Sequence, residues 1–250
     1  SVSPLCLLSI VLRRLLPGGS LRIWPEPALC RAPPDVAARG EIGAREDPRD
    51  ALITPTGKLL SDLPRDAVIG TSSLRRGAQL LAHRPELQII EFRGNVDTRL
   101  EKLHSGVIDG TLLAVAGLKR LGRAGVITEV LSVDEMMPAV AQGAIGVACR
   151  LGDNRVLEIL NPLNHAPTTV SVLAERALLA RLDGSCQTPI GALAKVEDNG
   201  KITLSGLLAA ADGSRLVKGT VSGESSLSVE LGRSLGAQLL SEAGPDFLLP

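Results

Sequence analysis

The segment 68–122 constrains the fold most strongly, because three short apolar runs in it each stop at small polar residues and give way to helical spacing. The predicted strands are 67–69, 88–92 and 111–115, and the predicted helices are 74–82, 96–104 and a short one carrying Lys119 and Arg120. Right-handed crossovers place the ends of successive parallel strands at one edge of a sheet. We therefore expect all three strand-to-helix junctions to lie together.

These junctions combine helix N-termini with cationic and hydroxyl side chains. The cations are Arg75, Arg76, Arg93, Arg99, Lys119 and Arg120, and the hydroxyls are Thr71, Ser72 and Ser73. Helix N-termini at the carboxyl ends of strands favour anions, and guanidinium groups bind carboxylates two bonds at a time. The pattern predicts a pocket for a ligand with several carboxylates or phosphates. The alternative is that each arginine is a solvated charge on a helix face.

Three motifs in this segment carry a family resemblance. They are GTSSLRR at 70–76, RGNVDTRL at 93–100 and LAVAGLKRLG at 113–122. In this order and spacing they resemble the porphobilinogen deaminase (hydroxymethylbilane synthase) family, and the resemblance extends from about Arg45 to near the C-terminus. It implies two doubly wound α/β lobes of the kind found in periplasmic binding proteins, the first one incomplete here, followed by a small α+β domain.

The implied domain division follows the chain. Residues 1–47 and 140–163 are expected to be a remnant of domain 1, residues 48–139 domain 2, and residues 164–250 domain 3. The segment around Pro48 and the small, apolar segment 136–150 match the family's two crossings between domains 1 and 2. Ala141 stands where a glycine is expected, so the turn before Gln142 is strained if its φ angle is positive. Cys149, in an apolar run, is expected to be an inert core residue.

The resemblance implies a transferase that joins four porphobilinogen units into hydroxymethylbilane in tetrapyrrole (haem and porphyrin) biosynthesis. Each unit carries two carboxylates, so the cleft must hold many negative charges. The residues implied to bind the cofactor are Arg75, Arg76, Arg93 and Ser73, and those implied to bind substrate are Thr71, Ser72, Arg99, Arg120 and Arg45. Arg45 lies in a dense charge cluster, so a local ion-pair network is an equal alternative for it.

Cys186 lies in the loop 183–191, between Gly184 and Pro189. This loop resembles the family's cofactor-attachment loop, whose cysteine holds a dipyrromethane through a thioether, although Ser185 replaces an expected glycine. Before the loop, 168–182 predicts an amphipathic helix capped by Thr168 or Thr169, with Leu173 on its apolar face and Glu175 on its charged face. After it, three strands at 192–197, 201–209 and 215–222 and a helix at 227–242 are expected.

Residues 1–44 do not resemble the rest, since prolines interrupt every candidate element and no period is sustained. The family's Ser-Leu-Lys-Asp segment, which supplies its main catalytic acid, does not occur in this sequence. One hypothesis is that this stretch is frame-shifted or mis-joined. Neither Asp97 nor Asp109 matches the missing motif, so we assign no catalytic acid, and we expect weak turnover or none.

Composition limits the partners. The chain has 27 basic and 27 acidic residues with no basic run, and its aromatic residues are few, so neither nucleic acid nor an anionic membrane is expected to bind. The four cysteines are widely spaced without a CxxC pair, which predicts no metal site and no disulfide framework and favours a reducing compartment, taken here as the cytoplasm. The apolar run 5–16 is too short to span a bilayer and contains Arg13 and Arg14, unlike an export signal. We expect a monomer.

The rival hypothesis is a non-catalytic module that binds carboxylates, because two-lobed α/β folds with anion sites at strand ends also serve solute-binding proteins. A pseudoenzyme fragment is intermediate between the two. The non-catalytic binding module does not account for the loop around Cys186, whereas the sequence does not separate a pseudoenzyme fragment from an active enzyme.

Overall fold

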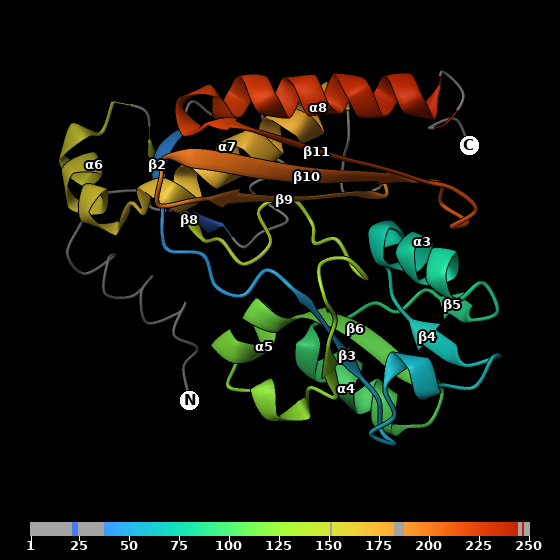
Figure 1. Cartoon of the computed structure of the whole chain (residues 1–250). Helices are drawn as coiled ribbons and strands as arrows, with labels where there is room; N and C mark the ends of the chain where they lie inside the picture. The colour runs from blue at the N-terminus through green and yellow to red at the C-terminus, as the bar shows by residue number, and fades with distance from the viewer. Residues whose placement is uncertain (1–21, 25–37, 151, 183–187, 245–246, 248–250) are drawn as a thin grey trace.

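The computed structural model describes residues 22–24, 38–150, 152–182, 188–244 and 247. One lobe holds a five-stranded sheet and helices α3–α5, and the other holds the C-terminal sheet with α7 and α8 (Figure 1). The lobes meet at the crossing segments near residues 43–49 and 136–145.

The five-stranded sheet has the order β5-β4-β6-β3-β7. Its strands are β3 (Asp50–Ile53), β4 (Val68–Gly70), β5 (Gln88–Ile90), β6 (Gly110–Ala114) and β7 (Glu129–Val130). The crossover helices are α3 (Leu74–His83), α4 (Val96–His104) and α5 (Val115–Arg120), and 3-10 turns lie at Leu60–Asp62 and Ala124–Val126. Strand β4 runs parallel to β5 and to β6, so the three predicted junctions do share one edge. That prediction is confirmed.

Strand β3 was not predicted as a strand. It runs antiparallel to both β6 and β7, and all four of its residues are buried. This strand has only four residues, between the charged segment 45–49 and the turn that begins at Pro55, so it shows no alternation of apolar and polar residues. Its pairing partners, β6 and β7, lie far along the chain. Its insertion places Asp50 in the middle of the sheet, beside the end of β6.

The C-terminal lobe holds a three-stranded antiparallel sheet and two long helices, as predicted, and both helices cover one face of the sheet (Figure 1). Its elements are β9 (Ile190–Val196), β10 (Lys201–Ala209), β11 (Leu216–Glu224), α7 (Ala166–Arg181) and α8 (Ser228–Ala243), with a 3-10 turn at Ser225–Leu227. Helix α7 begins earlier than predicted, because the Nδ1 atom of His165 accepts from the backbone N–H of Thr168 and Pro167 fits the first turn. The expectation that Thr168 or Thr169 caps the helix was wrong.

The third sheet has the order β1-β8-β2. Its strands are β1 (Arg22–Trp24), β2 (Ala38–Ile42) and β8 (Gly146–Arg150), and α6 (Asn154–Leu160) with a 3-10 turn at Asn161–Leu163 lies against it. The two short N-terminal strands therefore provide structure in part of the segment 1–44, while 1–21 and 25–37 lie outside the described residues. Cys149 is buried among Val147, Val156 and Leu160, which confirms its place in a core.

The two lobes contact each other through helix α3. Ala78 of α3 shares a buried apolar cluster with Leu207 and Ala209 of β10. The hairpin between β10 and β11 also contacts this helix: a Cβ atom on Gly213 would lie 2.7 Å from the carbonyl oxygen of Ala78. Glycine is therefore required at the hairpin tip by close approach as well as by its φ of 74°.

Candidate functional site

Two helix N-termini open at the shared edge of the sheet. The side chain of Ser73 caps α3 by accepting from the backbone N–H of Arg76, and Thr71 Oγ1 accepts from the N–H of Ser73 at 3.2 Å. The side chain of Asn95 caps α4 by accepting from the N–H of Thr98 at 2.8 Å. Both turns use polar side chains to satisfy backbone donors, which leaves their remaining N–H groups facing the edge.

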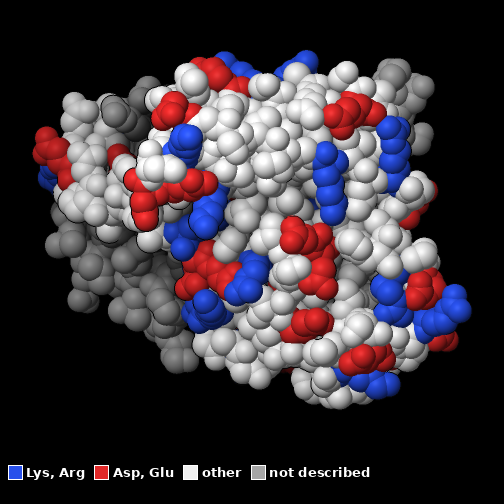
Figure 2. Space-filling view, in the orientation of Figure 1, with Lys and Arg blue, Asp and Glu red and all other residues white. Residues whose placement is uncertain are grey.

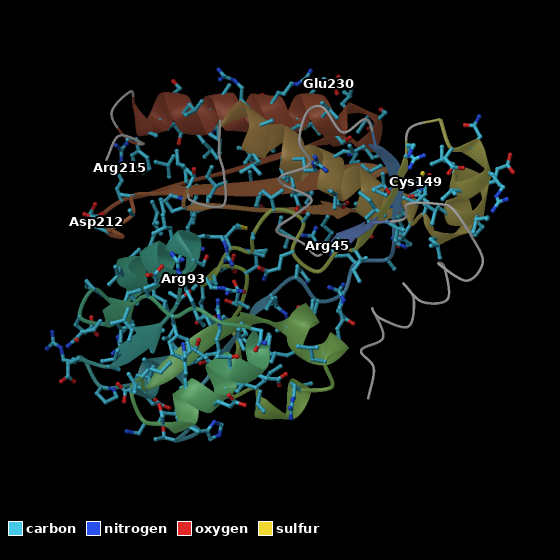
Figure 3. The ribbon with its side chains drawn as sticks, turned by 180° about the vertical axis from the view of Figure 1, so that it is seen from behind. Arg45, Arg93, Cys149, Asp212, Arg215 and Glu230 are labelled. Carbon is cyan, nitrogen blue, oxygen red and sulfur yellow. The ribbon has the colours of Figure 1, made fainter. Side chains whose placement is uncertain are left out.

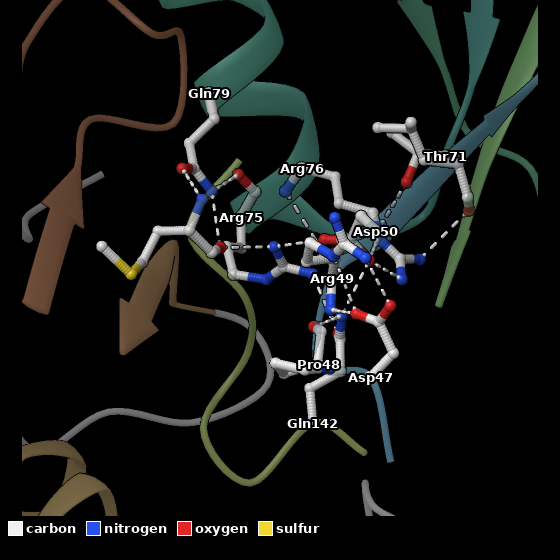
Figure 4. Close-up of polar contacts among 12 residues, drawn as sticks. Asp47, Pro48, Arg49, Asp50, Thr71, Arg75, Arg76, Gln79 and Gln142 are labelled. Carbon is white, nitrogen blue, oxygen red and sulfur yellow. Dashed lines mark hydrogen bonds and ion pairs between the residues drawn. The ribbon is translucent and has the colours of Figure 1, made fainter. Parts of the chain in front are cut away.

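The carboxylate of Asp50 lies between Arg75 and Arg76, and it is fully buried (Figure 4). Oδ2 accepts from Arg75 Nη1 at 2.8 Å, and Oδ1 accepts from Arg76 Nη2 at 2.7 Å and from its Nε at 3.1 Å. Gln142, in the crossing segment, donates from Nε2 to the same Oδ1 at 3.0 Å. One acid therefore joins β3, the start of α3 and the crossing segment.

The charge state of Asp50 follows from this geometry. Burial raises the pKa of Asp50, but the nearby Arg75 and Arg76 guanidinium groups, which also donate hydrogen bonds to it, outweigh that effect and lower the pKa to about 2. The carboxylate is therefore ionised at any physiological pH. With two guanidinium groups and one carboxylate, the cluster carries a net positive charge at the edge of the sheet.

Arg75 points inward. Only 5% of it is exposed, and besides Asp50 its Nη1 donates to the backbone oxygen of Met137 at 2.7 Å. Arg76 is partly buried, and its Nη1 donates to the backbone oxygen of Leu112 at 3.1 Å. Both arginines lie at the predicted edge, but each donates hydrogen bonds to other groups of the protein.

Arg99 is placed differently. Its Nη2 donates to Ser72 Oγ at 3.2 Å and its Nε to the backbone oxygen of Gly94 at 2.9 Å, and it has no acidic partner among the described residues. Burial, and then the like charge of Arg76, lower the pKa of Arg99. A half-buried cation that lies near another cation and donates to a hydroxyl group is stabilised by a bound anion.

Arg93 lies apart from the others. Its side chain is 80% exposed and forms an ion pair with Glu91 at 2.6 Å, and Lys102 Nζ donates to its backbone oxygen at 3.2 Å. Arg93 is predicted at the second junction, and its backbone lies there. Its guanidinium group, however, points to the surface.

The remaining cations contact the crossing segments. Arg120 donates from Nη2 to the backbone oxygen of Gly143, and Lys119 forms an ion pair with Glu46 at 2.8 Å. Arg45 lies between the two lobes in Figure 3 and forms an ion pair with Glu175 of α7 at 2.5 Å. These three cations therefore stabilise the region where the chain passes between lobes.

Glu175 was assigned to the wrong face of its helix. It is fully buried, whereas Leu173, expected on the apolar face, is 44% exposed. The carboxylate accepts from Arg45 and from the backbone N–H groups of Ala141 at 2.7 Å and Ala194 at 2.8 Å. These partners come from distant parts of the chain, and a helical wheel does not reveal them.

Ala141 has a φ of 61°, the positive value that the expected glycine position implied. It is the one non-glycine residue with positive φ in the described part of the chain. The prediction of backbone strain at this turn is confirmed, and the hydrogen bond from its N–H to Glu175 helps to hold it.

Cys186 and the loop 183–187 lie outside the described residues. The residues on either side are described: Leu182, buried at the end of α7, and Thr188, which precedes β9. In the described part of the chain no group of three or more His, Cys, Asp or Glu side chains could hold a metal ion, and no helix there is long and apolar enough to cross a membrane.

Asp97 and Asp109, the two acids that do not match the family's aspartate motif, lie at other places. Asp109 accepts from the backbone N–H of Val68 at 2.8 Å, at the start of β4 and thus at the opposite edge of the sheet. Asp97 forms an ion pair with Arg123 at 3.1 Å. Asp50, Gln142 and Glu175 were missed, and the one available signal was an acid directly before the apolar run 51–53.

Comparison with known sequences decides the family. A model of the dipyrromethane cofactor-binding domain of porphobilinogen deaminase matches residues 29–158, and a model of the C-terminal domain of the same enzyme matches residues 169–241. The chain belongs to the porphobilinogen deaminase family. The resemblance in the three motifs is thereby confirmed.

Individual relatives agree. Porphobilinogen deaminase of Syntrophotalea carbinolica is 50% identical over 208 residues, which cover 83% of this chain and 65% of the relative. The chloroplastic enzyme of Oryza sativa is 49% identical over 205 residues, 81% of this chain and 57% of the relative. The enzyme of Brevibacillus brevis is 45% identical over 215 residues, which cover 86% of this chain and 69% of the relative. The chain thus spans about three fifths of the length of the first two relatives.

Among solved structures, a periplasmic arginine-binding protein of Salmonella typhimurium covers 53% of this chain and 59% of its own, at 14% identity and a TM-score of 0.34. A similarity this low supports no functional argument.

Proposed function

We propose that this chain binds porphobilinogen and its oligomers at the junction edge and acts in the deaminating polymerisation that its family name describes. The net reaction converts four porphobilinogen and one water into hydroxymethylbilane and four ammonia. The observation that carries the proposal is Arg99, a half-buried cation beside Ser72 that has no acidic partner among the described residues. A substrate with two carboxylates per ring supplies the missing anion.

Each cation at the edge has a distinct proposed role. Arg99 and Arg76, with Ser72 and Ser73, bind carboxylates directly, since they surround the positive end of α3. Thr71 is buried, so its part in substrate binding is to hold the turn through the hydrogen bond that it accepts from Ser73. Arg75 is held by Asp50 and Met137, so it raises the local positive potential and fixes the start of the helix. Arg93, whose side chain is exposed, is proposed to bind carboxylates at the outer rim of the site. Arg45 and Arg120 act on substrate binding indirectly, because their contacts hold the crossing segments in place.

The fit of a dipyrromethane to this edge rests on charge. Such a group carries four carboxylates, and Arg76, Arg99 and the α3 N-terminus provide positive charge that the described acids do not fully neutralise. We propose that Cys186 holds it through a thioether. When bound, it supplies the pyrrole carbon to which the first substrate unit is joined.

No described acid near the edge fits the role of general acid. Asp50 has a pKa of about 2, and hydrogen bonds from Arg49 and the backbone lower the pKa of Asp47. A proton donor needs a pKa near the working pH, and both carboxylates stay ionised there. Since the family's aspartate motif is also absent from the sequence, we propose weak turnover or none. Consumption of porphobilinogen at rates typical of the family would contradict this.

The binding step is tested by calorimetric titration of porphobilinogen into the chain and into Arg99→Gln. The expected result is a dissociation constant raised about tenfold or more, because a charge-assisted contact is lost. Arg65→Gln removes an exposed arginine at another site and is the matched control. Equal affinities of the wild-type chain and Arg99→Gln would refute the proposed site.

The proposal keeps the division into domains 1–47 with 140–163, 48–139 and 164–250. A monomer remains part of the proposal, and so does the cytoplasm, a reducing compartment that the wide spacing of the cysteines favours. Family membership favours this function over the non-catalytic binding module.

A further inference from the structure

A groove on the C-terminal lobe has the chemistry of a second anion site. It runs between α7 and α8 and has a volume of about 480 Å³. Its lining residues are Leu173, Arg176, Ala177, Ala180, Arg181, Val229 and Arg233. The two helices cover one face of the β9–β11 sheet, and α3 packs against the other face. The groove is therefore separated from the junction edge by a sheet.

Glycines bring the two helices close enough to form this groove. A Cβ atom on Gly232 of α8 would lie 2.2 Å from the backbone oxygen of Ala174. At Gly236 it would lie 2.8 Å from Cβ of Arg181, so the stem of that arginine packs where a side chain is missing. This close packing brings the arginines of both helices to the sides of one shallow groove.

The floor of the groove is apolar. Leu173, Ala177 and Ala180 recur at helical spacing on α7, and Val229 faces them from α8. Leu173 is 44% exposed, so a ligand with an apolar body would bury additional apolar surface here. The α7 stripe from 173 to 181 is roughly 12 Å long at 1.5 Å per residue.

The cations of the groove have no acidic partner in the part of the chain that the structure describes. Arg176, Arg181 and Arg233 are exposed, and none of them forms an ion pair with another described residue. Glu230, the nearest acid along α8 to Arg233, lies on the outer side of that helix in Figure 3 and does not line the groove. Figure 2 shows acidic and basic side chains interspersed on the face it displays. The residues that line the groove, in contrast, include three arginines and no acid.

We propose that this groove binds an aromatic dicarboxylate. An apolar floor selects an apolar body, and guanidinium groups on both sides select carboxylates, which they bind through paired hydrogen bonds. A small inorganic anion would leave the floor uncovered, and a neutral aromatic compound would leave the arginines unpaired. The combination of the two features specifies the ligand class.

The test is a fluorescence titration of the full chain with stilbene dicarboxylate, with stilbene monocarboxylate as the second probe. We expect the dianion to bind at least tenfold more tightly than the monoanion and the binding to weaken as ionic strength rises. The double variant Arg176→Ala with Arg233→Ala should lose at least tenfold in affinity. Arg65→Ala with Arg155→Ala, two exposed arginines elsewhere, is the matched control and should retain it.

The location is checked independently by backbone amide chemical shifts. Shifts confined to α7 and α8, with the affinity for the probe unchanged in Arg99→Gln, support the proposal. Absence of binding, equal affinity in the double variant, or loss of probe binding in Arg99→Gln would each overturn it. Circular dichroism of both double variants confirms that the comparison is made between folded chains.

Discussion

The carboxylate of Glu175 accepts a 2.7 Å hydrogen bond from the backbone N–H of Ala141, the residue with a φ of 61°. The same carboxylate binds Arg45, so one buried acid on α7 contacts both crossings of the chain between its lobes. Helix α7 also leads into the loop with Cys186. The part of the chain that carries the cysteine is thereby joined to the region between the lobes.

We predict that Glu175→Gln lowers the free energy of unfolding by about 3 kcal/mol, because an amide has one acceptor oxygen for four donor contacts and leaves Arg45 buried without a counter-charge. Urea denaturation measures this change. Glu230→Gln, at an exposed position on α8, is the control and should change stability by under about 0.5 kcal/mol. A Glu175→Gln variant as stable as the control would contradict the role of Glu175 in joining the two crossings.

Asp50 gives a prediction about pH. Its pKa falls from 3.8 to about 2 on folding, so its contribution to stability is fully present above pH 3.8 and is lost as the pH falls through 2. Between pH 5 and pH 2 this group should remove about 2 kcal/mol of stability from the wild-type chain. Asp50→Asn should be less stable at pH 7 and should lack this part of the acid dependence. Parallel pH profiles for the two proteins would contradict the ion-pair cluster.

Gly213 and Gly200 form a matched pair, since both have positive φ and only Gly213 touches another element. Gly200→Ala should cost about 1 kcal/mol from backbone strain alone. Gly213→Ala should cost at least about 2 kcal/mol, because its Cβ would meet the backbone of α3. The difference between the two, measured by thermal or urea unfolding, reports the contact between lobes. Equal costs would mean that this contact contributes nothing.

Much of the fold could be predicted from the sequence where local pattern and tertiary structure agree. The junctions around Thr71 and Asn95 have short apolar runs, capping residues and helical spacing, and all of these act locally. The hairpins of the C-terminal sheet are likewise determined by local signals. Ala141 was predicted to be strained because its neighbours match a family turn.

The rest depended on partners far along the chain. Asp50 is held by Arg75, Arg76 and Gln142, and Glu175 is held by Arg45 and two backbone amides. The apolar periodicity of a helix (3.6 residues) or of a strand (2 residues) therefore does not reveal that these acids are buried. The direction of Arg93 was likewise open, because its ion pair with Glu91 lies outside any motif. Hydrogen bonds of this kind determine which arginines remain available for a ligand.

The thioether at Cys186 is tested most directly by intact-mass measurement of the chain after incubation with porphobilinogen. Attachment forms one C–S bond and releases one ammonia for each porphobilinogen unit incorporated. We expect a covalent increment equal to two deaminated porphobilinogen units in the wild-type chain and none in Cys186→Ser. An unmodified wild-type chain, or an increment that persists in Cys186→Ser, would contradict it.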